Sequence, residues 1–180
     1  MNNLLKHLKT INKHRWIVCK WCFKLGIPIQ GLVHDLSKYS PKELAIYKYY
    51  TGTRSPHDNA RDKLGYSPSW YHHKNKNKHH WEYWVDSLEK MNAVKIPFKY
   101  VVEMVADFIA AGQTYLGKDW TCHSPIDYHF KNRKKRVYHQ KSLFLFELIL
   151  FKLDELGEKQ FIKWFRQNKK QLKINYMEEN

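Results

Sequence analysis

The 180-residue sequence lacks the features that mark secreted and membrane proteins. It has only three cysteines, an odd number that is too small for a disulfide framework. No stretch approaches the roughly 20 consecutive apolar residues of a membrane span. The N-terminal residues MNNLLKH also lack the apolar segment of a signal peptide. We therefore expect a cytoplasmic protein with no membrane partner.

Acidic residues are scarce as well. The 17 Asp and Glu residues stand against 32 Lys and Arg residues, which gives a formal net charge of +15. Such an excess favours attraction to polyanions, so nucleotides and nucleic acid are candidate partners. A generally solvated basic surface explains the same charge, because the lysines are scattered along the chain. Charge alone does not choose between these two interpretations.

The sequence shows no strand-like alternation and no internal repeat, whereas apolar residues recur at helical spacing. The aromatic fraction of 16% supplies enough buried area for one core. We predict an all-α domain over residues 1–172 and a flexible tail over 173–180. Ser40, Pro41 and Glu43 form a capping box that predicts a helix through Tyr50. Other helices are predicted over 4–25, from 67, over 96–116, from 124, over 142–156 and over 159–172, the last two joined at Gly157.

An adjacent histidine and aspartate, His34 and Asp35, follow an apolar pair and precede Lys38. Imidazole and carboxylate groups are ligands for zinc, manganese and iron. On a helix the two side chains would point about 100° apart, so the pair could hold one metal or let the carboxylate reach a second. The alternative for any such dipeptide is a solvated or locally hydrogen-bonded pair.

Asp107 lies in an apolar run over residues 101–111. An unpaired carboxylate facing the core would be costly, and a metal ion would remove that cost. Asp107 could instead share an exposed stripe with Glu103, one helical turn earlier. His14 falls in the middle of the first predicted helix, where a histidine is more often a surface or core residue than a ligand.

Two histidine doublets, His72-His73 and His79-His80, lie in a segment that also carries three tryptophans. Tryptophan rings tend to be buried and would hold this segment against the core, which argues against a histidine-rich surface loop. Because the two rings of a doublet diverge, we expect one metal ligand from each doublet. The other ring would contact substrate or solvent.

Long stretches of the chain resemble a small bacterial and phage family that is catalogued as a domain of unknown function. These stretches cover residues 31–41, 50–56, 65–74, 77–84 and 99–104. The order His, His-Asp, His, His, Asp also resembles the HD-domain superfamily of metal-dependent phosphohydrolases. This second resemblance implies an HD-domain-like helical bundle.

The HD resemblance implies a set of metal ligands. His14, His34, Asp35 and Asp107 would hold a first divalent transition metal ion, which could be Mn, Fe, Zn, Co or Ni. Asp35 would bridge to a second ion held by one histidine of each doublet, which we assign to His73 and His79. Exchanging His73 for His72, or His79 for His80, fits the sequence equally well.

The reaction implied by this resemblance is hydrolysis of a nucleotide or another phosphoester. Lys38, one helical turn beyond His34, would contact a phosphate over the metals. Arg54 and Lys74 are further candidates for charge neutralisation. A spare histidine, His72 or His80, would protonate the leaving oxygen.

Two other functions remain open. One is a non-catalytic basic module that binds nucleic acid or a protein partner and holds one structural metal or none. The other is a di-iron oxygenase, which can use the same ligands. Cys19 and Cys22 are spaced like a metal or redox pair, but no second pair accompanies them, so we interpret them as small buried hydrophobic residues.

Overall fold

A computed structural model describes residues 3–90 and 92–178 of the protein. The chain is mostly helical, which confirms the all-α prediction, although two short antiparallel strands that the sequence did not indicate form a hairpin. Among the described helices, none is both long and apolar enough to cross a membrane. The α-helices are α1 (Asn3–Lys24), α2 (Pro28–Val33), α3 (Pro41–Leu44), α4 (Pro56–Leu64), α5 (Pro68–Lys76), α6 (Phe98–Tyr115), α7 (Ser124–Asn132) and α8 (Gln140–Met177). The strands are β1 (Val85–Ser87) and β2 (Asn92–Ala93), and 3-10 turns lie at η1 (Leu36–Tyr39), η2 (Ala45–Tyr49), η3 (Trp81–Trp84), η4 (Gly117–Asp119) and η5 (Arg133–Lys135).

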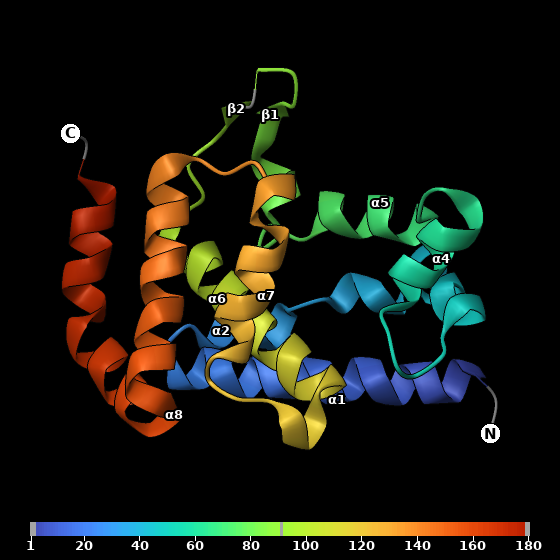
Figure 1. Ribbon diagram of the computed structural model, residues 1–180, viewed down its shortest axis with the longest axis horizontal. Helices are drawn as coiled ribbons and strands as arrows, with labels where there is room; N and C mark the ends of the chain where they lie inside the picture. The colour runs from blue at the N-terminus through green and yellow to red at the C-terminus, as the bar shows by residue number, and fades with distance from the viewer. Residues whose placement is uncertain (1–2, 91, 179–180) are drawn as a thin grey trace.

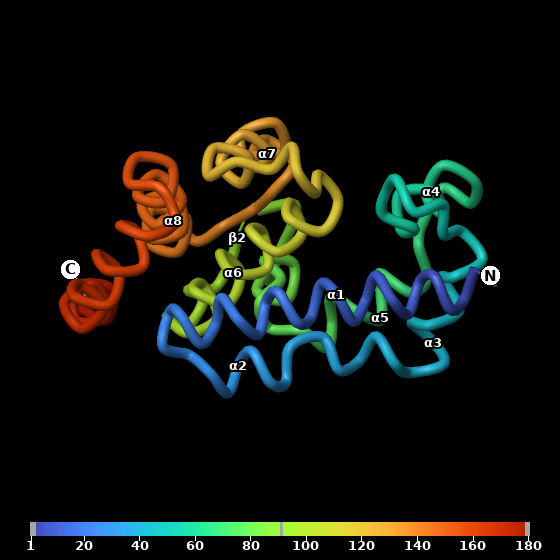
Figure 2. The backbone as a smooth tube through the Cα atoms, turned by 90° about the horizontal axis from the view of Figure 1, so that it is seen from below, coloured from blue at the N-terminus to red at the C-terminus, as the bar shows by residue number. Residues whose placement is uncertain are grey.

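Helix α6 is the centre of the core. It packs against α1, α2, α7 and α8, and Figures 1 and 2 show it enclosed between these elements. Apolar side chains are buried on several sides of α6, as expected for a helix with neighbours all round. Its fully buried members include Val101, Val105 and Ile109. A carboxylate on such a helix therefore faces protein rather than water.

Helix α2 lies against α1 at an unusually close approach. A Cβ atom added at Gly31 would be 2.7 Å from Cys22 Cβ and 3.0 Å from Cys19 Cα, so only glycine fits there. The Cys22 side chain is fully buried, and burial raises the pKa of its thiol. Both observations agree with the interpretation of the cysteine pair as packing residues.

The capping box forms, but the helix it starts is short. Ser40 Oγ accepts a hydrogen bond from the Glu43 N–H at 3.4 Å, and Pro41 occupies the first helical position. The predicted helix through Tyr50 is wrong in its extent, because α3 ends at Leu44 and the chain continues as the 3-10 turn η2. The short α3 leaves the Glu43 side chain buried.

Helix α8 folds back on itself at Gly157. This residue has φ 68° and ψ 166°, so the two predicted helices join at a kink, with the two limbs side by side in Figure 1. The helix continues to Met177, so residues 173–177 of the predicted tail are helical, whereas 179–180 lie outside the described residues. Tyr176 is buried and donates a hydrogen bond to the Ile96 carbonyl. Ser142 joins the same network, since its Oγ lies 2.8 Å from the Tyr176 hydroxyl and accepts from the Ile96 N–H at 2.9 Å.

Candidate metal centre

The His34-Asp35 pair lies in a turn between α2 and η1 and not on a helix. His34 is extended (φ −51°, ψ 128°), and Asp35 adopts the left-handed conformation (φ 53°, ψ 26°). A positive φ is uncommon outside glycine, although aspartate tolerates it better than most residues. Arg15 on α1 supports the turn, since its Nε donates to the His34 carbonyl at 2.8 Å and its Nη2 to the Leu32 carbonyl at 3.2 Å. The turn directs both side chains of the pair into the protein.

One group of metal-ligating atoms lies between this turn, α1 and α6. His14 Nε2 is 3.0 Å from Asp107 Oδ1, and His34 Nε2 is 3.7 Å from the same oxygen. Asp35 Oδ2 completes the group, 3.3 Å from His34 Nε2 and 3.9 Å from His14 Nε2. Asp107 therefore faces this group, and the exposed stripe considered from the sequence is wrong.

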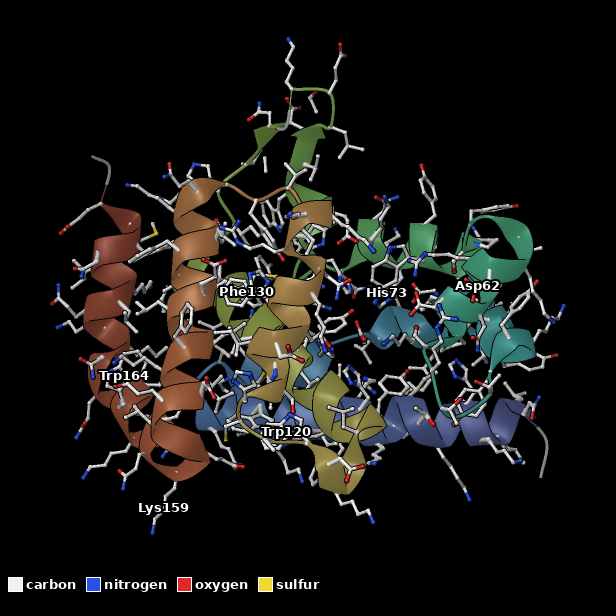
Figure 3. All side chains as sticks on the ribbon, in the orientation of Figure 1. Asp62, His73, Trp120, Phe130, Lys159 and Trp164 are labelled. Atoms are coloured by element: carbon white, nitrogen blue, oxygen red, sulfur yellow. The ribbon has the colours of Figure 1, made fainter. Side chains whose placement is uncertain are left out.

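A second group lies between the turn and α5. Asp35 Oδ1 is 3.3 Å from His73 Nε2 and 3.4 Å from His79 Nε2. His80 Nε2 is 2.8 Å from His73 Nε2, and all four side chains offer atoms close enough for one metal ion. Figure 3 shows His73 on the side of α5 that faces α1. The carboxylate of Asp35 thus directs one oxygen to each group.

A buried glutamate connects the two groups from behind. Glu103 on α6 places one oxygen, Oε1, 2.9 Å from His34 Nδ1 and 3.1 Å from His79 Nδ1. A carboxylate accepts only from a protonated nitrogen, so Nδ1 is the donor in both rings and Nε2 is left facing the cluster. Carboxylates that orient ligand histidines in this way are typical of metal sites.

Glu43 plays the same part for the second group. Its Oε2 lies 2.7 Å from His73 Nδ1, and its Oε1 lies 2.7 Å from His72 Nδ1. The side chain of Glu43 is almost fully buried and is presented by the capped end of α3. His73 is therefore held with Nε2 toward Asp35, whereas His72 contacts the other oxygen of Glu43.

Several buried polar atoms of the cluster lack a hydrogen bond of acceptable geometry with any described residue. Such atoms normally cost about 1–3 kcal/mol each, so their concentration in one place needs an explanation. Each of these atoms belongs to one of the two ligand groups, where a metal ion would satisfy it. The four atoms are His14 Nε2, His34 Nε2, His79 Nε2 and Asp35 Oδ1.

The carboxylates of the cluster are ionised despite their burial. Burial by itself raises the pKa of Asp35, but His34, Lys38 and His73 outweigh it and hold the pKa well below its usual value. Burial likewise raises the pKa of Asp107, but the neighbouring imidazoles of His14, His34 and His79 outweigh burial and lower the pKa. The site therefore concentrates negative charge where a cation can bind.

Protons compensate this negative charge. Burial lowers the pKa of His79, yet Asp35 and Glu103 raise it to about 10. The pKa of His34 is raised too, because the nearby Asp35 outweighs burial. A divalent ion would displace these protons, and the donor set of imidazoles and carboxylates suits such ions. The residues present therefore fit one or two transition metal ions.

Lys38 reaches the cluster through its contact with Asp35. Its Nζ lies 2.6 Å from Asp35 Oδ2, and the side chain is partly exposed. Burial lowers its pKa, but Asp35 and Asp107 raise it to about 12, so the ammonium group is retained. The lysine offers a positive charge at the accessible side of the cluster.

The doublets differ from the predicted pattern. Both rings of the second doublet reach the second group, with the centroids of His79 and His80 4.3 Å apart. The structure therefore brings both histidines of this doublet to the group, whereas one ligand from each doublet was expected, because the segment after α5 turns both rings toward the group. In the first doublet only His73 faces the cluster.

Arg54 and Lys74 are not brought to the cluster. Arg54 precedes α4, where its Nη1 contacts Asp62 Oδ2 at 2.5 Å on the surface, and Figure 3 places Asp62 away from His73 toward one end of the molecule. Lys74 follows His73 on α5 and lies over the Tyr71 ring at 5.7 Å. Local partners decide both positions, and adjacent residues of one helix face different directions.

Sequence reasoning missed three residues that build the site: Arg15, Glu43 and Glu103. Glu43 was interpreted only as a capping residue, and Glu103 only as part of an exposed stripe. The available signal for Glu103 was its spacing of one helical turn from Asp107 inside an apolar run. Glu103 is 4% exposed.

Residues 3–150 match the model of a catalogued family, described as "Family of unknown function (DUF5662)". This match covers most of the chain, so the chain belongs to that family. No curated protein and no solved structure matches the chain.

Proposed function

We propose that this family member is a metal-dependent phosphohydrolase with a dinuclear HD-type centre, acting on a nucleotide or another phosphoester. One observation carries the proposal. The carboxylate of Asp35 lies between two groups of buried ligands and offers one oxygen to each. A bridging carboxylate of this kind suits two divalent ions that act on one phosphoryl group.

Each of the two ligand groups would hold one ion. His14, His34 and Asp107 would hold the first ion together with the nearby Oδ2 of Asp35, and Asp35, His73, His79 and His80 would hold the second. Bound divalent ions lower the pKa of a coordinated water and polarise phosphoryl oxygens.

The remaining residues support binding and orientation. Lys38 presents its ammonium group beside Asp35 and would pair with a phosphoryl oxygen of the substrate. Glu43 and Glu103 hold the imidazoles by Nδ1. His80 fits a ligand better than the general acid considered from the sequence, because burial and the neighbouring His79 and His73 keep its pKa well below the usual value.

The first test is the metal content of untagged protein purified without a metal-affinity column. We expect about one to two equivalents of a transition metal in the wild type and a large loss in Asp35→Ala. Asp62→Ala, which removes a carboxylate from the surface of α4, is the matched control and should keep the metal.

The metal-loaded protein is then assayed against a panel of nucleotides and simple phosphomonoesters. Metal-dependent release of phosphate that disappears in Asp35→Ala supports the proposal. Folded wild-type protein that neither contains metal nor takes it up would refute it and favour a basic binding module. Oxygen consumption that requires iron, without phosphoester cleavage, would assign oxygenase chemistry instead.

A further inference from the structure

An open cavity of about 600 Å³ lies at the junction of α4 and α5, outside the ligand groups. Its walls combine aromatic rings with two basic side chains. The residues that line it include Arg61, Tyr66, Ser67, Trp70, Tyr71 and Lys74. None of them belongs to the candidate metal ligands.

The aromatic rings of this cavity are unusually accessible. Tyr66 is 62% exposed and Tyr71 is 68% exposed, although a tyrosine ring gains free energy from burial. The two cations lie against ring faces: Arg61 is 5.3 Å from the centre of the Trp70 ring, and Lys74 is 5.7 Å from that of Tyr71. Arg61 also contacts Asp58 Oδ1 at 2.6 Å. Among the ion pairs of the described residues, none involves Lys74, so its charge is the one available to a ligand. The cavity therefore joins stacking surfaces to positive charge.

Trp70 separates this cavity from the second ligand group by the thickness of one side chain. The centre of its ring is 4.9 Å from that of His80 and 5.5 Å from that of His73. Ser67, also in the wall of the cavity, has its Oγ 3.0 Å from His57 Nδ1. A ligand in the cavity would thus lie next to the candidate metal centre.

We infer that this cavity binds the base of a nucleotide, with the base stacked on the tyrosine rings and the charge of Lys74 in the cavity wall. Every nucleobase has a planar face that stacks on aromatic residues, and Lys74 adds attraction to the phosphate. That the cavity serves as a substrate subsite rests on the proposed function; that it binds a nucleotide rests on its own residues. The nucleotide could be free or could be the end of a single strand.

The test measures binding of the phosphonate analogue of AMP, in which CH₂ replaces the ester oxygen, so that hydrolysis cannot interfere. Calorimetry on the protein as purified compares this probe with methylphosphonate, which has no base. We expect the base-containing probe to bind at least about tenfold more tightly, and Tyr71→Ala and Lys74→Ala each to weaken it about tenfold. The matched controls are Phe144→Ala, which removes a ring that is 69% exposed on α8, and Lys159→Ala on the second limb of α8, and both should bind as the wild type does.

Absence of probe binding, or equal affinities in the cavity variants and their controls, would overturn the inference. A 5′-phosphorylated tetranucleotide identifies the source: tighter binding than the AMP analogue assigns a strand end, and equal binding a free nucleotide. The result is independent of the metal test. If the protein binds the probe but holds no metal, nucleotide binding in the cavity is supported and the proposed function is refuted. If the protein is a metal-dependent phosphatase that does not distinguish the two probes, the proposed function is supported and the inference about the cavity is refuted.

Discussion

At the scale of single residues, the cluster depends on buried carboxylates that hold its histidines in position. Glu103 is the clearest example, because one oxygen receives Nδ1 from His34 of the first group and from His79 of the second. Both rings lose their orientation together if this oxygen is removed. The two candidate metal positions are therefore linked through one side chain.

This link predicts the behaviour of Glu103 variants. Glu103→Gln keeps an oxygen but loses the charge, and we expect metal affinity to fall roughly tenfold; Glu103→Leu removes the acceptor and should cost roughly a hundredfold. Chelator competition measures both equivalents, and Glu155→Gln on the exposed side of α8 is the control. A loss confined to one equivalent would show that Glu103 does not couple the positions.

A change at Lys38 should impair catalysis and leave metal binding intact, unlike a change at Glu103. Lys38→Met keeps the aliphatic stem and removes the charge that would meet the phosphoryl oxygens, so kcat/KM should fall roughly a hundredfold while bound metal stays unchanged. Lys42→Met, at an exposed position of α3, should change neither quantity. Loss of metal in Lys38→Met would instead assign the lysine to the support of Asp35.

At the scale of elements, the packing of α2 against α1 sets the position of His34 and Asp35. The turn that carries His34 and Asp35 is the direct continuation of α2, and α2 is placed by its contact with α1 at Gly31. A side chain at Gly31 would force the two helices apart. Any shift of α2 moves the two central ligands.

We therefore expect Gly31→Ala to lower both stability and metal affinity. Overpacking of this kind costs about 1–3 kcal/mol in the free energy of unfolding, which urea denaturation measures. Gln30→Ala, one position earlier on α2, adds no atom to the chain and should stay close to the wild type. Unchanged stability in Gly31→Ala would mean that α1 and α2 can separate without cost.

The elements also explain which features the sequence could predict. Helix starts at Ser40 and the break at Gly157 follow from local chemistry, so they were predicted correctly. The left-handed Asp35 and the burial of Glu43 arise from contacts between distant segments, which no local pattern contains. Arg54 was misplaced because the carboxylates of Asp58 and Asp62 on the following helix α4 contact it instead.

At the scale of the whole molecule, many histidines are buried in a strongly basic protein. Burial lowers the pKa of His7 to about 4, with Lys38 contributing in the same direction. Burial also lowers the pKa of His57 and of His129. The folded state therefore binds fewer protons than the unfolded state in mild acid, and stability falls as the pH decreases.

His7 allows a direct test of this dependence. Its unfolded pKa is about 6.5, so its contribution to acid destabilisation begins near pH 6.5, grows as the pH falls and levels off near pH 4. We expect His7→Phe, which keeps a ring against Tyr50, to reduce the stability lost over this range by on the order of 1–2 kcal/mol. Urea denaturation at a series of pH values measures the difference. Identical slopes for the wild type and the variant would contradict the burial of a neutral His7.

The second limb of α8 supports the helix that carries part of the candidate site. The family match ends at residue 150, yet Phe161 and Phe165 beyond it belong to the core. Tyr176 closes a ring of hydrogen bonds with Ser142 and Ile96, just before the chain enters α6. Helix α6 in turn carries Glu103 and Asp107. Proteolytic removal of the last helical turn of α8 would therefore lower the metal affinity of the candidate site, although the cut lies far from it.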